Sequence, residues 1–210
     1  MIFMDIKEVL DALDKAKDPK QSYGGSSFNV GYHTLKLRDK VYKGQRNNTV
    51  RLSDVDFDFK DKSVLDLGCN VGGMLHELSP IIQYGVGVDY NIDCINAANA
   101  IRDYNGTYNI HFYQFDLCKQ PIEQIRSFVM EDKIDICFFL SMIMWIKNWR
   151  DVLNYLKLIS NYLLIELNGD NQDVQLGVVK TIYSNVSLIY DKSLDDPGQH
   201  NRKLYICNDI

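Results

Sequence analysis

The sequence lacks the marks of secreted, membrane-spanning and nucleic-acid-binding proteins. Its five cysteines are scattered and form no C-x-x-C pair, which is typical of reduced intracellular thiols rather than of a disulfide framework. No apolar run approaches the length of a membrane span, and the first residues do not have the layout of a signal peptide. The net charge of −5 gives no strong nucleic-acid footprint. We therefore expect a cytoplasmic protein with no membrane partner.

Histidines are few and are not clustered. The four are His33, His76, His111 and His200, and their spacing is not that of metal ligands, so we expect no metal site. A chain of 210 residues with 46% hydrophobic and 24% charged residues is ordinary for a globular protein, and it can bury one core. No internal repeat is present, and no feature sets an oligomeric state.

A strand, a glycine-rich turn and a helix follow one another within residues 63–78. The strand is apolar except for Asp66, and Gly68 permits a sharp turn at its end. Asn70 holds the middle of the turn, where Asn adopts left-handed conformations at low cost. Gly72 leaves room for the close approach of a ligand, and the helix that follows points its free N–H groups into the turn. This pattern predicts a site that presents backbone to a small molecule.

Two interpretations of the turn remain. As Gly68-x-Asn70-x-x-Gly73 it is a damaged dinucleotide fingerprint, in which Asn would obstruct the pyrophosphate. As Asp66-x-Gly68-x-Asn70-x-Gly72 it resembles the first motif of the class I S-adenosylmethionine (SAM) methyltransferases, which tolerates Asn at the middle position. The resemblance favours the second interpretation. It implies that the turn binds the cofactor through Asp66, Gly68, Cys69, Asn70 and Gly72.

The second predicted strand, residues 84–89, ends in Asp89. Asp89 lies roughly 20 residues beyond the turn, the spacing of an acid that accepts hydrogen bonds from ribose hydroxyls. Tyr90 would pack on the ribose or the adenine edge. The third strand, residues 110–117, ends at Asp116, and the resemblance implies that Asp116 accepts from the adenine amine while the backbone of Leu117 contacts the ring. The alternative for Asp89 is a turn-forming or helix-capping role, and the alternative for Asp116 is a plain acid at the end of a strand.

The near-continuous apolar run at residues 134–142 is typical of a central parallel strand. Its tail occupies the place of the family's fourth motif, which borders the methyl group and the substrate. The resemblance therefore implies that Leu140 contacts the cofactor and that Ser141, Met142 and Trp145 line the substrate. Alternatively, the apolar side chains here, Met144 included, fill the core. The tetrapeptide Asn/Asp-Pro-Pro-Tyr/Phe of many base-amine methyltransferases is absent, as is a Lys-Asp-Lys-Glu set, and both absences disfavour those classes.

The segment before the first motif divides into three parts. The first, Asp5–Ala16, has the periodicity of a short amphipathic helix. The second, Gln21–Phe28, is rich in Gly and Ser and is expected to be a loop. The third, Tyr32–Arg51, is locally basic and is either a solvated connector or, by the resemblance, a lid over the pocket. In the lid, Gln45 or Arg46 would meet the methionine carboxylate of SAM, and His33 would be the base for a hydroxyl acceptor.

From residue 63 onward the predicted elements alternate between strand and helix and close with a strand pair at 186–190 and 203–207. This order predicts an α/β fold with a doubly wound, seven-stranded, mostly parallel sheet, a C-terminal antiparallel hairpin and three α/β/α layers. Ligands bind such sheets at the carboxyl ends of the strands, and Glu166 or Asn168 would face the pocket there. We expect one globular unit with a helical, lid-like extension over 1–58 and a SAM-binding domain over 59–210.

The expected activity is a direct SN2 methyl transfer from SAM to an oxygen or nitrogen of a small molecule or a tRNA-type RNA base. The sulfonium is already an activated leaving group, so the protein mainly has to align the acceptor. Two alternatives remain open. One is a non-catalytic, SAM-binding partner subunit, and the other is an NAD-dependent oxidoreductase, which Asn70 disfavours.

Overall fold

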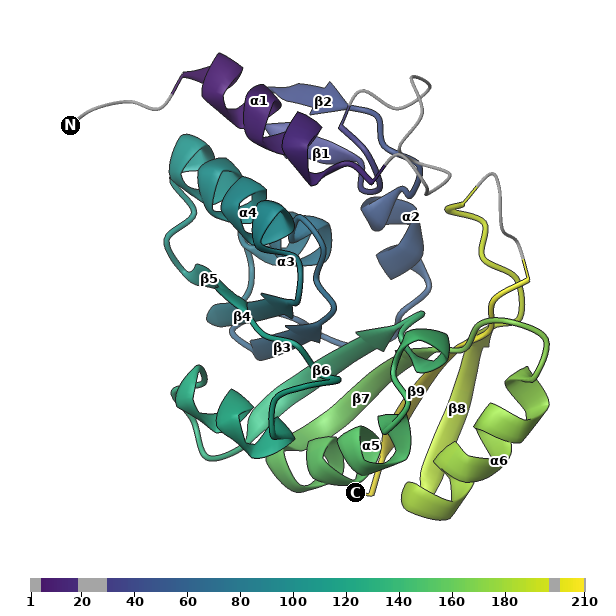
Figure 1. Cartoon of the computed structure of the whole chain (residues 1–210). Helices are drawn as coiled ribbons and strands as arrows, with labels where there is room; N and C mark the ends of the chain where they lie inside the picture. The colour runs from purple at the N-terminus through teal and green to yellow at the C-terminus, as the bar shows by residue number, and fades with distance from the viewer. Residues whose placement is uncertain (1–4, 19–29, 197–200, 210) are drawn as a thin grey trace.

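The computed structural model describes residues 5–18, 30–196 and 201–209 (Figure 1). Its centre is a seven-stranded sheet with the strand order β5-β4-β3-β6-β7-β9-β8. The strands are β3 (Ser63–Leu67), β4 (Tyr84–Asp89), β5 (Ile110–Gln114), β6 (Ile134–Leu140), β7 (Ser160–Glu166), β8 (Asn185–Tyr190) and β9 (Leu204–Asn208). Across the described residues, no helix has both the length and the apolar character needed to cross a membrane.

The first five strands of this sheet are parallel, and the last two reverse. β3 pairs in parallel with β4 and β6, β4 pairs with β5, and β6 pairs with β7. β9 inserts between β7 and β8 and runs antiparallel to both. The predicted seven-stranded, mostly parallel sheet with an antiparallel C-terminal hairpin is confirmed. The order changes direction between β3 and β6, which is the topological switch point.

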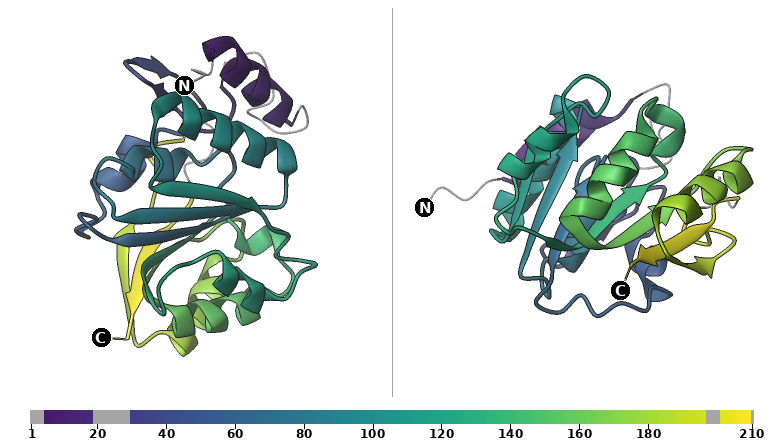
Figure 2. Two further views of the ribbon diagram at one scale, coloured as in Figure 1. Left: turned by 90° about the vertical axis from the view of Figure 1, so that its left-hand side faces the viewer. Right: turned by 90° about the horizontal axis from the view of Figure 1, so that it is seen from below.

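Helices cover both faces of the sheet, as Figure 2 shows. One face carries α3 (Gly73–Leu78) and α4 (Ile92–Asn105), and the other carries the 3₁₀ helix η2 (Ile122–Ser127), α5 (Trp149–Ile159) and α6 (Gln172–Ile182). Successive residues of β6 serve the two faces, because Phe138 packs in the core under α3 and Phe139 in the core under α5. The three predicted layers are therefore confirmed.

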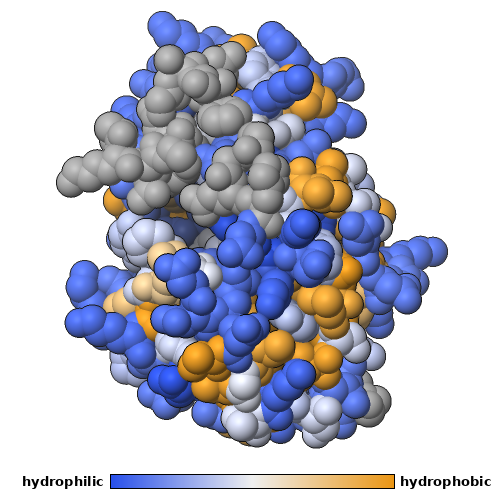
Figure 3. All heavy atoms as spheres, turned by 90° about the vertical axis from the view of Figure 1, so that its right-hand side faces the viewer, coloured by the Kyte–Doolittle hydropathy of each residue, from blue (hydrophilic) through white to orange (hydrophobic). Residues whose placement is uncertain are grey.

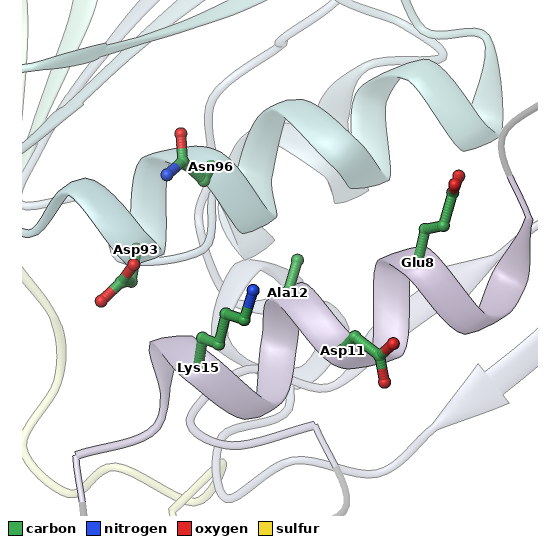
Figure 4. A pocket seen from close by; sticks show the side chains of 6 residues that line it. All are labelled: Glu8, Asp11, Ala12, Lys15, Asp93 and Asn96. Carbon is green, nitrogen blue, oxygen red and sulfur yellow. The ribbon is translucent and has the colours of Figure 1, made fainter.

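Helix α1 (Ile6–Ala16) adds an outer layer on α4. Asp5 caps its N-terminus in a capping box with Glu8, and the predicted helix at 5–16 is confirmed. Its apolar side chains Val9 and Leu13 are buried with Cys94, Ala97 and Ile101 on the outer side of α4. A groove between the two helices is lined by Glu8, Asp11, Ala12, Lys15, Asp93 and Asn96 (Figure 4). None of these lining residues belongs to the predicted site.

The segment before β3 is folded, so its interpretation as a solvated connector is wrong. It contains the hairpin β1 (Leu35–Leu37) and β2 (Lys40–Tyr42), the helix α2 (Asn48–Ser53) and a parallel bridge between His33 and Arg46, none of which the sequence predicted. Two of its basic residues, Arg46 and Arg51, are buried because carboxylates elsewhere in the chain pair with them, whereas the lysines of its hairpin and Arg38 are exposed. The predicted Gly/Ser-rich loop at Gln21–Phe28 lies outside the described residues.

Two boundaries differ from the prediction. The third strand ends at Gln114, because the Asp116 side chain accepts the backbone N–H of Cys118 and starts a turn. Residues 121–130, which begin with a proline suited to a first helical turn, predict a short helix, and the structure forms the 3₁₀ helix η2 there. A second 3₁₀ helix, η3 (Ile143–Trp145), follows β6.

The outer edge of the sheet is β8. Figure 3 faces the side of the molecule on which β8 and α6 lie in Figure 1, and its lower half carries hydrophobic patches between hydrophilic side chains. Leu188 of β8 and Val174 of α6 are both exposed. Neither lies at the carboxyl end of a parallel strand, where the site residues gather.

Candidate functional site

The carboxyl ends of β3 and β4 are tied together at one rim. The backbone N–H of Asn70 donates to Oδ2 of Asp89 at 2.9 Å, and the N–H of Asn91 donates to Oδ1 at 2.9 Å. Burial raises the pKa of Asp89, and these backbone donors partly oppose the rise. Phe115 donates its N–H to the carbonyl of Asp89, which brings the residues after β5 to the same rim. Asp89 and Asp116 therefore lie on one edge of the sheet.

The turn after β3 needs its glycines. The φ angles of Gly68, Asn70 and Gly72 are +76°, +52° and +73°, so three residues adopt the left-handed conformation. A Cβ added to Gly68 would lie 2.2 Å from Sδ of Met142, and one added to Gly72 would lie 2.3 Å from the Phe112 ring. The glycines are thus required by the close packing of Met142 and Phe112 against the turn, in which Gly68 and Asn70 remain partly exposed.

Asp66, the acid within β3, has an unusually high pKa. Asp66 is 3% exposed, and burial raises its pKa to about 7. The positive charge of Arg51 lowers this pKa, and the negative charge of Asp89 raises it. Asp66 and Arg51 therefore influence each other behind the turn. Cys69, in the turn itself, has a buried side chain, so only its backbone can serve a ligand.

Among the residues expected at the adenosine end, Tyr90 is exposed and Asp116 is partly exposed, whereas Leu117 is buried. Asp116 binds Lys119 at 3.0 Å, and this hydrogen bond together with the backbone N–H of Cys118 lowers the pKa of the Asp116 carboxyl. Tyr90 is 67% exposed, next to Asp89. Leu117 is buried, which leaves its backbone for contact with a ring.

The end of β6 carries a strained residue. Ser141 has a φ of +60°, a conformation that costs a non-glycine residue about 1–3 kcal/mol. Its backbone N–H donates to the carbonyl of Glu166 at 3.0 Å, and its carbonyl accepts Nδ2 of Asn168 at 2.8 Å. Its hydroxyl donates to the Glu166 carboxylate. The turn places the side chain of Met142 over Gly68, at the switch point of the sheet.

The segment after this turn faces outward. Met144 is 58% exposed and Trp145 is 61% exposed, so the alternative in which these side chains fill the core is wrong for both. Met142 is partly buried against the core on the α5 face. Leu140, the last residue of β6, is buried.

Arg46 is fully buried and lies in a cluster of charges. Its Nη2 donates to Oε1 of Glu166 at 2.8 Å and to Oδ1 of Asp195 at 3.0 Å, and its Nη1 donates to the Tyr32 hydroxyl at 3.2 Å. Burial lowers the pKa of Arg46, but Glu166 outweighs this and raises it. The guanidinium expected to meet a methionine carboxylate is thus already occupied by two carboxylates of the chain. Its neighbour Gln45 donates to Asp196.

Glu166 is the centre of this cluster. Besides Arg46, its carboxylate accepts Nη2 of Arg51 at 2.7 Å and the Tyr190 hydroxyl at 3.2 Å. Burial raises the pKa of Glu166, but Arg51 and Arg46 more than offset this and hold it well below its usual range. Arg202 completes the cluster, 3.6 Å from Glu166 and 3.7 Å from Asp196. The cluster thus joins the N-terminal segment, the ends of β6 and β7, and the loop after β8.

Two buried polar atoms near these strand ends have no hydrogen-bond partner among the described residues. They are Nε of Arg51 and Oδ1 of Asn168. A buried donor or acceptor without a partner is costly, so such atoms mark places where a ligand or water is expected. The sequence did not single out Arg51. The available signal was Glu166, a carboxylate at the end of a buried strand that requires a buried cation.

His33 lies beside the turn rather than at the mouth of the site. Its ring packs against Gly73, and its Nδ1 hydrogen-bonds to Oδ1 of Asn48 at 2.7 Å. Burial lowers the pKa of His33 to about 3, with the charges of Arg51 and Arg46 lowering it further and Asn48 opposing. A group with so low a pKa is neutral at pH 7 and is a weak base.

These features fit an adenosyl cofactor. The left-handed turn exposes backbone, a buried carboxylate lies at the next strand end, and an unpartnered arginine donor lies beside the turn. A dinucleotide would need a second glycine where Asn70 stands. Within the described part of the chain, no group of three or more His, Cys, Asp or Glu residues could hold a metal ion.

Comparisons with known proteins agree with this geometry. Residues 38–196, more than half of the chain, match the profile of a family described as "Methyltransferase domain". The N-terminal domain of EvdMO1, solved with S-adenosylhomocysteine (SAH) and D-fucose, has a TM-score of 0.68 at 8% identity, with 98% of this chain and 97% of that one covered. A TehB-like SAM-dependent methyltransferase from Corynebacterium glutamicum has a TM-score of 0.55 at 16% identity, with 77% and 86% covered.

Longer proteins also contain this fold. WbdD matches with a TM-score of 0.54 at 20% identity over 70% of this chain, which spans only 36% of WbdD. The chain likewise spans 48% of full-length EvdMO1. A search of curated proteins finds no match. At these identities the structural likeness shows the fold, while the profile shows the family. The chain therefore belongs to the methyltransferase domain family and has the class I fold.

Proposed function

We propose that this chain transfers the methyl group of SAM directly to a hydroxyl oxygen of a carbohydrate. The observation that carries the proposal is the link between the turn after β3 and Asp89, with Asn70 donating to Oδ2 at 2.9 Å. This link supports an arrangement in which an adenosyl group lies across β3 and β4 with its sulfur end toward the end of β6. The acceptor would then lie between the end of β6 and solvent.

In this arrangement the adenosine end lies over β4 and β5. Asp89 accepts hydrogen bonds from the ribose hydroxyls through the lone pairs of its carboxylate that the backbone N–H groups of Asn70 and Asn91 do not use. Asp116 and the backbone of Leu117 meet the adenine, as the family resemblance implies. The exposed ring of Tyr90 covers the ribose or the adenine edge.

The methionine end lies in the turn, and Arg51 meets its carboxylate in place of Arg46. Arg46 is fully occupied by Glu166 and Asp195, whereas Nε of Arg51 has no partner among the described residues. An arginine with a free donor beside a glycine turn suits a carboxylate. We assign His33 a supporting role against Gly73 rather than that of a general base, because burial keeps its pKa near 3.

The acceptor side favours a carbohydrate over an RNA base. Trp145 and Met144 offer an exposed apolar wall after the end of β6, and Oδ1 of Asn168 is a buried acceptor without a partner among the described residues. A sugar ring has an apolar face of C–H groups for such a wall and hydroxyls for such an acceptor. The net charge of −5 does not favour RNA. The N-terminal domain of EvdMO1, which aligns with nearly the whole of this chain, was solved in the presence of SAH and D-fucose.

The residues of the chain serve this reaction by alignment. When bound, the cofactor supplies a methyl group on a sulfonium that leaves as a neutral thioether. Met142 closes the space over Gly68, which sets the direction from which the acceptor can approach. Ser141 and Asn168 hold the end of β6 in one conformation through their mutual hydrogen bond. In the transfer, the acceptor oxygen would bond to the methyl carbon as the sulfur–carbon bond breaks, and the hydroxyl proton would pass to solvent water.

The test has two stages. Calorimetry with SAH should show one binding site, and NAD should not bind. The purified chain is then incubated with carbon-13-methyl SAM and either D-fucose or a uridine-containing RNA, and the product is read by NMR, in which oxygen-bound and nitrogen-bound methyl carbons are resolved. The proposal predicts a methyl ether on the sugar. SAH binding with a label found on nitrogen or only on RNA would overturn the acceptor assignment.

A further inference from the structure

We propose that Glu166 is a positioning residue that couples the methionine end of the cofactor site to the acceptor side of the site. The inference rests on the proposed placement of the cofactor. It goes further, because it assigns one buried carboxylate the task of linking two binding steps. The residues that carry it are Arg51 on the cofactor side and Ser141 on the acceptor side.

A single oxygen atom of Glu166 contacts both sides. Oε2 accepts Nη2 of Arg51 at 2.7 Å and the hydroxyl of Ser141, and it also accepts Nη1 of Arg46 at 3.1 Å. The other oxygen, Oε1, accepts Nη2 of Arg46 at 2.8 Å and the hydroxyl of Tyr190 at 3.2 Å. The carboxylate is fully buried, so these interactions are not screened by solvent. A change at Arg51 therefore reaches Ser141 through one shared acceptor.

The acceptor side has a conformation that depends on such contacts. Ser141 has a φ of +60° and is held by its backbone N–H, its carbonyl and its hydroxyl. The residues that follow are Met142, which lies over Gly68, and the exposed Trp145. A residue held in a strained conformation by several contacts can shift when one of them weakens.

On the cofactor side, Arg51 has one hydrogen-bond donor that no described residue uses. Nε of Arg51 is buried without a partner among the described residues, while Nη2 is bound to Glu166. A carboxylate arriving at Arg51 would compete with Glu166 for its positive charge. The negative charge that Glu166 recovers would then act on the other donors at Oε2, which are the hydroxyl of Ser141 and Nη1 of Arg46. By linkage, a change at Ser141 must alter the affinity for the cofactor by the same factor.

The test is a double-mutant cycle in the full-length chain, with SAH as the ligand and calorimetry as the measurement. Removing the Ser141 hydroxyl leaves Oε2 more available to Arg51, so Ser141→Ala should weaken SAH binding by about tenfold. In the Arg51→Met background the same substitution should have no effect. Tyr190→Phe removes a contact to Oε1 only, and it is the matched control that should leave SAH affinity unchanged.

Two further variants separate coupling from folding. Ser141→Gly also lacks the hydroxyl, but glycine adopts a φ of +60° without strain. This variant should therefore weaken SAH binding as Ser141→Ala does, and it should unfold at a higher temperature than Ser141→Ala. Glu166→Gln should abolish the effect of Ser141→Ala; if this variant does not fold, the cycle with Arg51→Met decides alone. Effects of Ser141→Ala that persist in the Arg51→Met background would overturn the coupling.

A second readout follows the acceptor side directly. The chain has two tryptophans, so Trp149→Phe leaves Trp145 as the only fluorophore of this kind. SAH should shift its emission, whereas methylthioadenosine, which lacks the carboxylate, should not. Equal shifts with both ligands would show that the signal does not pass through Arg51 and would contradict the inference. Failure of the wild-type chain to bind SAH at all would instead overturn the proposed function.

Discussion

The backbone N–H of Asn70 donates to Oδ2 of Asp89 at 2.9 Å, across the ends of two neighbouring parallel strands. The bond joins the left-handed turn to the carboxylate that follows β4. It also explains why Asn is acceptable at the centre of the turn, because its backbone rather than its side chain makes the connection. The methyltransferase site is organised around this pair.

Loss of the Asp89 carboxylate should weaken cofactor binding. Asp89→Ala leaves the ribose hydroxyls without their acceptor, and we expect SAH affinity to fall by about 1–3 kcal/mol. Titration calorimetry measures the change. Asp93→Ala, an exposed acid in the first turn of α4, is the control of equal charge change. An unchanged affinity in Asp89→Ala would rule out the ribose role.

Arg51 and the cofactor carboxylate can be tested by comparing two ligands. Arg51→Met should weaken binding of SAH by about 1.5–3 kcal/mol, the value of a hydrogen bond between charged groups, and should leave methylthioadenosine binding unchanged. Arg38→Met removes an exposed arginine from the turn between β1 and β2 and should change neither affinity. Equal weakening for both ligands would indicate that Arg51 supports the fold of the site and does not bind the carboxylate.

The turn should not tolerate a side chain at Gly68. Gly68→Ala places a Cβ at a φ of +76° and 2.2 Å from Sδ of Met142, so we expect a loss of at least about 1–2 kcal/mol in the free energy of unfolding. The double variant with Met142→Ala should recover the part due to the collision. Chemical denaturation measures both. Gly177→Ala in α6, where a Cβ meets nothing, should instead stabilise by about 0.5–1 kcal/mol.

Asp66 should make stability fall as pH rises. Its pKa is about 7 in the fold against an ordinary value of 3.8, so between these values the folded state holds a proton that the unfolded state has released. Stability is then lost at up to about 1.4 kcal/mol per pH unit. Asp66→Asn has no such proton, so its advantage over the wild type should grow from pH 3.8 to about 7 and then level off. A constant difference across this range would contradict the assignment.

Much of the fold follows from local patterns in the sequence. Buried strands such as 134–140 are nearly continuous apolar runs, and the glycines after β3 mark a turn that no other residue fits. Because parallel strands end at the same edge, the order of strands alone brings Asp89 and Asp116 together. These features depend on a few neighbouring residues each, which is why the sequence predicts them.

The charge cluster could not be predicted in this way. Arg46 and Arg51 are separated from Glu166 by more than a hundred residues, and the segment that contains them has the composition of a solvated surface. Only the folded chain shows that carboxylates bury these arginines. The same long-range pairing occupies Arg46 and leaves Nε of Arg51 without a partner among the described residues, which no local pattern in the sequence indicates.

The cluster also bears on how the molecule can be divided. Glu166, Asp195 and Asp196 come from the second half of the chain, and two of the three arginines opposite them come from residues before β3. A version trimmed to begin at residue 59 would keep every strand of the large sheet, yet it would leave three interior anions facing Arg202 as their one remaining cation among the described residues. The N-terminal segment therefore supplies most of the positive charge that neutralises these buried carboxylates. Removing it would leave them largely without counter-charges in the interior of the protein.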